Sequence, residues 1–414
     1  MKCFLIAAPA SGSGKTTVAR GLMSELAGRG LAVQPFKCGP DYIDTKFHSA
    51  VCGRPSVNLD TFMATPAHVR ELFARYADGA DVCVVEGMMG LFDGYDRDRG
   101  SSAEIACALG IPVVLVVDAR SAAYSLAPLL KGFATFRADV RICGVIFNKV
   151  GSTRHRQMLL QVCEDTGLKC LGFLSREARL ETGSRYLGLD FSSQRNAQQN
   201  AGTESLFSSI ADAVLETIPD MTIASSPAPP PAEGRVLIAR NAESFSFLYQ
   251  EVIDRFADVA YFDPETDVPQ LDGIHLLYLP GGYPEKHLPE LSKNEGARQA
   301  IKDYADRGGR IVAECGGMMY LCESIIDDGG NYPMCGVLSY TISARREDRR
   351  LSLGYRRFTL DGCEYRGHEF HYTQFSGGLP PSAAQVFNAA GEPVPTPVIR
   401  QQNVLASYTH LYQI

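Results

Sequence analysis

The first half of the chain alternates short apolar runs with stretches of helical periodicity. The near-continuous apolar runs lie at residues 4–6, 82–85, 113–117 and 142–147. Such runs are typical of parallel strands that are covered on both faces. Residues 19–29 and 121–136 instead repeat their apolar positions at the helical period, which predicts crossover helices. The alternation predicts a doubly wound α/β domain, whose sites lie at the carboxyl ends of its strands.

The pattern changes near residue 220. Residues 225–231 read Ser-Ser-Pro-Ala-Pro-Pro-Pro and cannot form a packed element, so they predict a semi-rigid extended linker. A proline-rich ligand for a partner protein is the alternative. The sequence therefore predicts a first domain at residues 1–220, a linker at 221–234 and a second domain at 235–414.

The second domain opens with a predicted strand at residues 235–239. The next stretch has the spacing of an amphipathic helix. Its apolar face carries Phe245, Leu248, Val252 and Phe256. Further strands are predicted at residues 274–279, 311–313, 337–342, 355–360 and 369–375. The second half is thus predicted to be a separate α/β domain with a β-rich tail beyond Gly336.

A glycine-rich turn joins the first apolar run to the first helix pattern. Gly12 and Gly14 let backbone N–H groups turn toward an anion, and the following helix N-terminus adds unsatisfied donors. Lys15 would reach the β- and γ-phosphates, and the Thr16 hydroxyl would bind Mg²⁺. Pro9 stands where phosphate loops usually begin with glycine, and an ordinary strand–helix turn is the alternative. The predicted ATP-binding residues are Ser11, Gly12, Ser13, Gly14, Lys15, Thr16 and Thr17.

Three polar side chains follow other strands of the same domain. Asp41 lies on a turn after an apolar run, and Glu86 directly follows the strand at residues 82–85. We expect both carboxylates to share a Mg²⁺ ion with Thr16, directly or through water. A turn residue is the alternative for Asp41, and a helix cap is the alternative for Glu86. Asn148 ends another strand and would meet the nucleotide base, or form a turn.

The second domain carries a cysteine on a predicted strand-to-helix turn. Cys315 is followed by Gly316 and Gly317, the elbow geometry of a covalent nucleophile, and a helix N-terminus there favours the thiolate. The backbone N–H groups of Gly316 and Gly282 are candidates for an oxyanion hole. His410 is the candidate base. An inert core thiol and a structural histidine are the alternatives.

Two further patterns have less specific meanings. In a strand, His368 and Phe370 would point one way, and Glu369 and His371 the other. We expect them to support the cleft around the cysteine; a metal pair is the alternative. The arginine-rich residues 345–350 predict a solvated loop, with contact to an acidic substrate as the alternative.

Composition narrows the class of protein. A chain of 414 residues predicts two domains, and its net charge of -7 argues against nucleic acid as a partner. No apolar run approaches the ~20 residues of a membrane span. The chain enters the first strand directly, which leaves no room for a signal peptide, so the 12 cysteines predict reduced thiols and a cytoplasmic location.

Several motifs occur in an order that matches one family. After the phosphate loop these are residues 39–44 (GPDYID), 86–94 (EGMMGLFDG), 279–285 (LPGGYPE), 314–321 (ECGGMMYL) and 407–412 (SYTHLY). From Lys2 to its C-terminus the chain resembles the cobyrinic acid a,c-diamide synthase family of corrinoid biosynthesis. The first domain resembles dethiobiotin-synthetase-type enzymes, and the second resembles class I glutamine amidotransferases.

The resemblance implies an ATP- and glutamine-dependent carbon–nitrogen ligase. Cys315 would release ammonia from glutamine, and ATP would phosphorylate the a and c acetates of cobyrinate so that ammonia can displace phosphate. Tyr42 and Asp44 would lie where the macrocycle's acetate meets the γ-phosphate. The family also suggests a homodimer.

One departure from the resemblance concerns the base. Class I amidotransferases usually carry a glutamate two residues after the histidine, whereas this chain has Tyr412 there. The third member of the triad stays open, with Glu369 as a candidate. Nickel-sirohydrochlorin a,c-diamide synthase is the nearest alternative, cobyric acid synthase is less close, and a partitioning-type ATPase is the alternative from another class.

Overall fold

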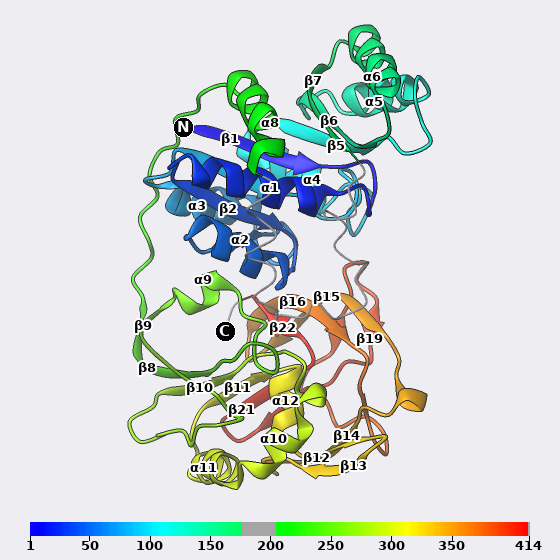
Figure 1. Ribbon diagram of the computed structural model, residues 1–414. Helices are drawn as coiled ribbons and strands as arrows, with labels where there is room; N and C mark the ends of the chain where they lie inside the picture. Colours follow the sequence, from blue (N-terminus) through cyan, green and yellow to red (C-terminus); the bar gives the residue numbers. More distant parts are fainter. Residues whose placement is uncertain (176–203, 413–414) are drawn as a thin grey trace. The chain divides into compact units, whose positions relative to one another are not determined.

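The computed structural model describes residues 1–175 and 204–412 (Figure 1). The chain divides into two compact units, Met1–Ala228 and Pro229–Ile414. The division falls inside the proline-rich stretch that predicted a linker. Strand β8 (Ala232–Ala239) begins directly after this stretch, three residues before the predicted strand start at residue 235.

The first unit is built on a seven-stranded sheet with the order β3-β2-β4-β1-β5-β6-β7. Every neighbouring pair is parallel. The strands are β1 (Lys2–Ala7), β2 (Val33–Cys38), β3 (Val57–Leu59), β4 (Val82–Glu86), β5 (Val113–Asp118), β6 (Ile142–Val150) and β7 (Lys169–Ser175). The carboxyl ends of β2, β4 and β1 therefore meet at one edge, where the predicted phosphate loop begins.

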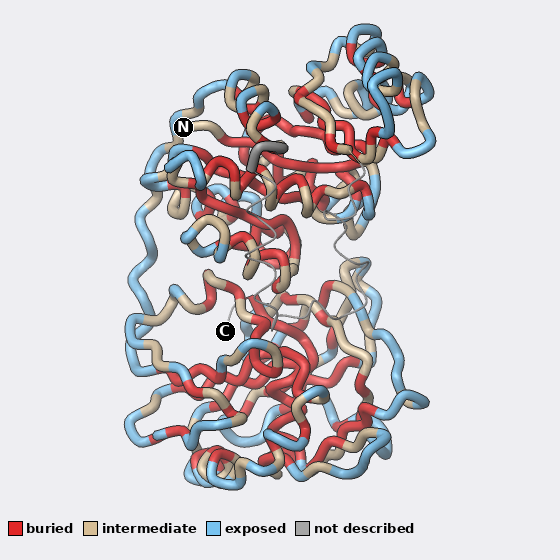
Figure 2. The backbone as a smooth tube through the Cα atoms, in the orientation of Figure 1, coloured by how far each residue is buried: buried red, intermediate tan, exposed pale blue. Residues whose placement is uncertain are grey.

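Helices cover this sheet. They are α1 (Lys15–Gly28), α2 (Asp44–Cys52), α3 (Pro66–Ala77), α4 (Ser102–Leu109), α5 (Leu126–Phe136), α6 (Thr153–Thr166) and α8 (Glu204–Thr217). Helix α1 packs so closely on α8 that a Cβ at Gly21 would lie 2.2 Å from the Phe207 ring. Leu22 of α1 is fully buried in this core, which contributes roughly 1.5–3 kcal/mol to folding. Strand and core segments appear as the buried parts of the tube in Figure 2.

Helix α5 begins at Leu126, five residues later than residue 121, where the helical pattern predicted it. Pro128 gives the reason, because a proline ring clashes with the carbonyl four residues earlier unless it lies in the first turn. Ser121 also has a positive φ of 60°, a backbone conformation that a regular α-helix excludes at this residue.

The second unit combines three sheets. A six-stranded sheet has the order β20-β21-β11-β10-β8-β9, and it is parallel except for β20 with β21. Its further strands are β9 (Phe256–Phe262), β10 (Leu276–Leu279), β11 (Ile311–Glu314), β20 (Val398–Gln401) and β21 (Val404–Ser407). A four-stranded sheet contains β13 (Gly330–Pro333), β12 (Cys322–Asp327), β14 (Leu338–Ser343) and β17 (Gln374–Phe375). A five-stranded sheet contains β19 (Pro393–Val394), β18 (Val386–Phe387), β15 (Ser352–Leu360), β16 (Cys363–His371) and β22 (His410–Leu411).

The helices of this unit are short, apart from one. They are α9 (Gln250–Ile253), α10 (Leu288–Lys293), α11 (Glu295–Asp306) and α12 (Gly316–Leu321), with the 3₁₀ turns η3 (Pro284–Lys286) and η4 (Arg346–Asp348). Helix α12 follows β11 directly, so the turn between them carries Cys315.

Two predictions for this unit are wrong in detail. The expected helix with Phe245, Leu248, Val252 and Phe256 is reduced to the four residues of α9, and Phe256 opens strand β9. The backbone N–H groups of Ser246 and Phe247 donate instead to the Gly281 carbonyl, at 2.9 and 3.0 Å. This non-local pairing replaces the helical hydrogen bonds.

The strand predicted at residues 369–375 is also not continuous. Strand β16 ends at His371, and β17 resumes only at Gln374 in a different sheet. His371 Nδ1 lies 2.8 Å from the Thr373 carbonyl, a contact that stabilises the bend between the two strands.

Candidate functional site

The turn between β1 and α1 has the form of a phosphate loop. Gly12 and Gly14 have φ values of 81° and 96°, which favour glycine. Asn148 Nδ2 donates to the Ser13 carbonyl at 3.0 Å, and a Cβ at Gly14 would lie 2.1 Å from that nitrogen. The Asn148 side chain therefore stabilises the loop through this hydrogen bond. Its role beside a nucleotide base stays a prediction.

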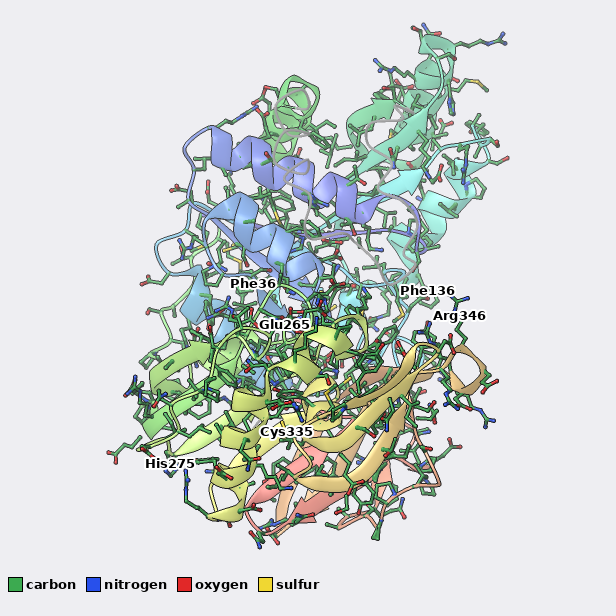
Figure 3. The ribbon with its side chains drawn as sticks, turned by 60° about the horizontal axis from the view of Figure 1, so that its bottom comes forward. Phe36, Phe136, Glu265, His275, Cys335 and Arg346 are labelled. Carbon is green, nitrogen blue, oxygen red and sulfur yellow. The ribbon has the colours of Figure 1, made fainter. Side chains whose placement is uncertain are left out.

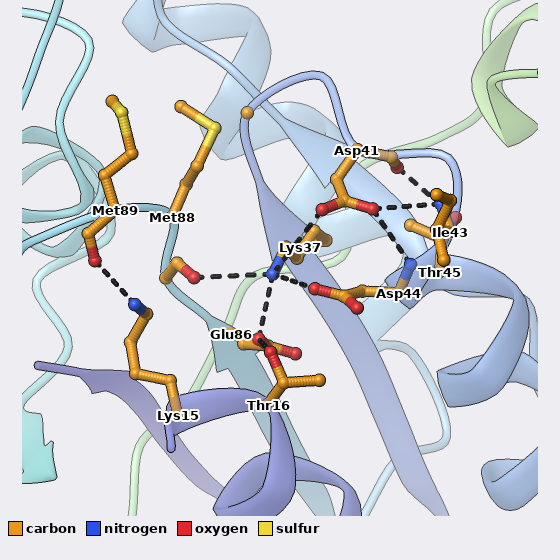
Figure 4. Close-up of polar contacts among 12 residues, drawn as sticks. Lys15, Thr16, Lys37, Asp41, Ile43, Asp44, Thr45, Glu86, Met88 and Met89 are labelled. Atoms are coloured by element: carbon orange, nitrogen blue, oxygen red, sulfur yellow. Dashed lines mark hydrogen bonds and ion pairs between the residues drawn. The ribbon is translucent and has the colours of Figure 1, made fainter. Parts of the chain in front are cut away.

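Lys15 and Thr16, at the start of α1, face the end of β4. The Lys15 Nζ donates to the Met89 carbonyl at 2.5 Å, and the Thr16 Oγ1 donates to Glu86 Oε1 at 2.6 Å (Figure 4). The side chains of Thr16 and Glu86, two of the predicted Mg²⁺ ligands, are thus in direct contact.

A buried lysine that the sequence motifs did not single out lies at the centre of this cluster. Lys37 Nζ is 2.6 Å from Asp44 Oδ2, 2.9 Å from Glu86 Oε1 and 4.0 Å from Asp41 Oδ2 (Figure 4). Burial opposes its charge, but the carboxylates of Glu86, Asp44 and Asp41 outweigh burial and raise the pKa of Lys37. Its ammonium group holds the three acidic side chains together.

Glu86 is fully buried and stays ionised. His48, also fully buried, places Nε2 2.7 Å from Glu86 Oε2. Burial alone would raise the pKa of Glu86, yet Lys37, His48 and Thr16 together lower it. A helix cap is therefore not the role of this side chain in the structure.

Asp41 does act as a turn residue. Its Oδ1 accepts from the backbone N–H groups of Ile43 and Asp44, both at 2.9 Å, at the start of α2. Its other oxygen faces Lys37. The turn interpretation and the metal interpretation are therefore compatible, because a different oxygen serves each.

The two predicted substrate residues are largely enclosed. Asp44 is 1% exposed and paired with Lys37, and Tyr42 is 8% exposed. Their role toward a substrate stays a prediction.

Lys37→Met is expected to lower the free energy of unfolding of the first unit by about 3–5 kcal/mol, because Glu86 and Asp44 would be left buried without their cation. Urea unfolding with and without MgCl₂ measures this. If Mg²⁺ binds the same carboxylates, it should restore more stability to the variant than to the wild type. Lys131→Met, on the exposed side of α5, is the control and should change stability by less than about 0.5 kcal/mol. An equally stable Lys37→Met protein would contradict the central role of the ammonium group.

In the second unit, Cys315 occupies a strained turn. Its φ of 46° and ψ of -107° are unusual for a residue with a side chain, and such strain costs of order 1–3 kcal/mol. Its Sγ lies 3.9 Å from the Phe370 carbonyl of β16. Strain of this kind is typical of a nucleophile elbow.

Burial outweighs the predicted effect of the helix N-terminus, although the Gly316 N–H at the start of α12 does lower the pKa of the Cys315 thiol. Burial, followed by the negative charge of Glu285, raises the pKa of the Cys315 thiol. Helix α12 has only 6 residues, and its effect does not offset burial. Cys315 is therefore a neutral thiol that needs a base.

Glycines allow two turns to pack closely together: Gly316 and Gly317 follow Cys315, and Gly281 follows β10. A Cβ at Gly317 would lie 2.0 Å from the Leu279 carbonyl, and a Cβ at Gly281 would lie 2.1 Å from His410 Cε1. A Cβ at Gly316 would lie 3.1 Å from the backbone nitrogen of Gly282. The two backbone positions predicted for the oxyanion hole, Gly282 and Gly316, are therefore neighbours, and the His410 ring lies against Gly281, the residue before Gly282.

His410 is buried at the start of β22, opposite His368 of β16. Burial, together with His368 and His371, lowers the pKa of His410 to about 3. The imidazole is therefore neutral near pH 7, the form that can accept a proton.

Glu369, the candidate for orienting this base, is occupied elsewhere. Its carboxylate accepts hydrogen bonds from Arg356, Ser352 and Thr396, each at 2.6 Å. His371 Nε2 lies 2.8 Å from it. Because a carboxylate accepts about four hydrogen bonds, these four partners occupy the acceptor sites of Glu369. The pKa of Glu369 falls to about 2, because His371 and Arg356 outweigh burial. Glu369 and His371 thus form a supporting network.

No group of three or more His, Cys, Asp or Glu side chains suited to a metal ion occurs among the described residues. The metal-pair alternative for His368 and His371 gains no support from the structure. Residues 345–350 lie largely exposed, with Arg346 pointing outward (Figure 3). Residues 346–348 form η4 within this exposed segment.

Comparison with known proteins covers both units. The CobQ/CobB/MinD/ParA nucleotide binding domain matches residues 4–189, and the CobB/CobQ-like glutamine amidotransferase domain matches residues 245–413. A hydrogenobyrinate a,c-diamide synthase of Streptomyces coelicolor is 38% identical, over 99% of this chain and 94% of that protein. Those of Rhizobium meliloti and Brucella suis are 38% and 39% identical, over 99% of this chain and 99% and 98% of theirs. The chain belongs to the hydrogenobyrinate a,c-diamide synthase family.

Membership in this synthase family confirms the predicted resemblance and the fold class. The first unit is the nucleotide-binding half, and the second is the glutamine amidotransferase half. The predicted enzyme class, an amide-forming ligase, is that of the family. Among the described residues, no helix is both long and apolar enough to span a membrane.

Lys37, His48 and Glu314 lie at the two sites, but the sequence assigned them no role. Lys37 stands two residues before the GPDYID motif, so proximity to that motif was a usable signal. Nothing in the linear sequence connects His48 with Glu86. Glu314 directly precedes Cys315, and its part in the site is argued below.

Proposed function

We propose that this chain uses ATP and glutamine to convert the a and c acetate groups of a corrin macrocycle into amides, in cobalamin biosynthesis. The observation that carries the proposal is the packing of two turns in an amidotransferase-type domain: the turn of strained Cys315 lies against Gly282, and the neighbouring Gly281 lies against the His410 ring. Near-full-length similarity to synthases named for hydrogenobyrinate supports the substrate class.

The glutaminase half-reaction begins at Cys315. His410 removes the thiol proton while sulfur attacks the side-chain carbonyl carbon of glutamine, forming a C–S bond. The N–H groups of Gly282 and Gly316 stabilise the negative oxygen of the tetrahedral intermediate. The C–N bond then breaks, and the proton held by His410 leaves with ammonia. Water hydrolyses the thioester to glutamate and regenerates the thiol.

The synthetase half-reaction makes an acetate reactive. A carboxylate is a poor electrophile, and transfer of the γ-phosphoryl group gives it a leaving group. The loop from Ser11 to Thr17 holds the phosphates, with Lys15 near the β/γ bridge and Asn148 beside the base. Ammonia attacks the acyl phosphate carbon, and inorganic phosphate leaves.

Mg²⁺ would neutralise charge on the β- and γ-phosphates. The Thr16 hydroxyl and the Asp41 and Glu86 carboxylates would hold it, and they fit because oxygen atoms are the ligands that Mg²⁺ prefers. The contact between Thr16 Oγ1 and Glu86 Oε1, at 2.6 Å, supports a shared ion, while Lys37 lies among the same carboxylates and balances part of their charge. Asp44 and Tyr42 would contact the acetate group.

The test is steady-state amidation followed by mass spectrometry. Hydrogenobyrinate, cobyrinate and nickel-sirohydrochlorin are offered side by side with ATP, Mg²⁺ and glutamine. We expect two amidations of a corrin substrate, each lowering its mass slightly because NH₂ replaces the OH of a carboxyl group. Preference for nickel-sirohydrochlorin would favour the alternative substrate, and ATP hydrolysis without any amidation would favour the ATPase-switch alternative. The cytoplasmic location and the homodimer stay predictions.

A further inference from the structure

Glu314, the last residue of β11, has a buried carboxylate that lies against strands β10 and β22. Its Oε1 accepts the backbone N–H of Leu411 at 3.0 Å, and its Oε2 accepts the Tyr278 hydroxyl at 2.9 Å. The same Oε2 lies 4.0 Å from His410 Nδ1. The residue that precedes the nucleophile in sequence is thus connected to both residues of the strand that carries the base.

A histidine that deprotonates a thiol needs a defined ring orientation and tautomer. A carboxylate that accepts a hydrogen bond from Nδ1–H leaves the lone pair on Nε2 directed at the nucleophile. In this chain the position two residues after His410 is Tyr412, which is buried and packs edge-on against Tyr249 at 5.2 Å. Tyrosine cannot supply that negative charge at neutral pH.

We propose that Glu314 is the positioning residue that orients His410 and stabilises its protonated form during glutamine hydrolysis. The proposal rests on the glutaminase function proposed above. In this role Glu314 would do what the glutamate after the histidine does in class I amidotransferases, although it comes from β11. A charge-assisted N–H···O bond is about 2.7–2.9 Å long, so the present separation must close by about 1 Å. Such contacts commonly tighten when substrate binds.

The charge of Glu314 depends on its surroundings. Tyr278 on β10 and His410 on β22 face its carboxylate, and on β21 its neighbour in register is the neutral Ser407. On β16, His368, His371 and Glu369 act on His410. Burial raises the pKa of Glu314 to about 8, although bonds from Leu411 and Tyr278 lower it. Since the ionised carboxylate is the form that orients the imidazole, glutaminase activity should rise as the pH increases through about 8.

Glu314→Gln tests the inference, because the carboxamide keeps the size of the side chain and can still accept from the Leu411 N–H. We expect kcat for glutamine hydrolysis to fall at least about tenfold and KM for glutamine to stay within about twofold. The rise in rate near pH 8 should disappear. Amidation supported by added ammonium chloride should stay within about twofold of wild type, because this half-reaction does not use His410.

Tyr278→Phe is the matched control within the same buried network. It removes the phenol that donates to Glu314 but keeps the carboxylate, so kcat above the pH-dependent rise should stay within about threefold. Because the Tyr278 bond lowers the pKa of Glu314, its loss should move the rise to higher pH.

The outcomes separate this inference from the proposed function. A wild-type protein that hydrolyses no glutamine contradicts the proposed function itself. Normal wild-type glutaminase activity with an unchanged kcat and pH profile in Glu314→Gln overturns only the role of Glu314. If circular dichroism shows that Glu314→Gln is unfolded, the pH profile of Tyr278→Phe becomes the test. A Tyr278→Phe protein whose glutaminase activity has the wild-type pH profile would overturn the inference.

Discussion

Cys315→Ser is expected to lower glutamine-supported amidation by about 1,000-fold or more, because a hydroxyl in this buried turn is a far weaker nucleophile than a thiol. Amidation supported by ammonium chloride should stay within about twofold of wild type, because the acyl phosphate forms in the other unit. Both rates are measured by mass spectrometry of the macrocycle under otherwise identical conditions.

Cys322→Ser provides the matched control. Cys322 is also fully buried and lies at the end of α12, where its Sγ is 3.4 Å from the Met318 carbonyl. The same chemical change there should leave glutamine-supported amidation within about threefold. Equal loss of glutamine- and ammonia-supported amidation in Cys315→Ser would show that the two half-reactions are not divided as proposed.

Lys15→Ala is expected to stop amidation with either nitrogen source, by at least about 100-fold, because a preorganised positive group would be lost from the phosphate site. Glutamine hydrolysis should survive in part, since Cys315 and His410 belong to the other unit. The measurements are amide formation and glutamate release in the same reaction.

Lys131→Ala, on the exposed face of α5, controls for loss of one positive charge in the same unit. It should leave both rates within about twofold. If Lys15→Ala amidates normally with ammonium chloride, the loop from Ser11 to Thr17 does not hold the phosphates of the reaction.

Much of the architecture could be predicted because its signals are local. Continuous apolar runs such as residues 113–117 predicted central parallel strands, and these residues lie in β5. Glycine positions predicted the turn before α1 and the turn before α12. In the structure, Gly14 and Gly317 have no room for a side chain. Motif order also led to the family, which the comparison confirmed.

Errors arose where distant backbone groups compete with a local pattern. The apolar face that includes Phe245 and Phe256 has helical spacing, yet Ser246 and Phe247 pair with Gly281, over thirty residues away. For Cys315 the sequence indicated the effect of the helix N-terminus on the thiol but not the burial that outweighs it. Burial is a property of the packed unit, and the sequence around the cysteine does not express it.

By itself, the sequence determined that one half is a nucleotide-binding domain and the other a glutamine amidotransferase domain. Glycine turns, strands and the residues at strand ends are recognisable because each is encoded by a short consecutive stretch. Only the tertiary structure decided which charges meet. Lys37 faces Glu86 because β2 and β4 pair in register, and Glu314 approaches His410 because β11 and β22 end beside each other around the Leu411 N–H. Electrostatic interaction depends on distance and burial, and neither can be obtained from positions along the chain.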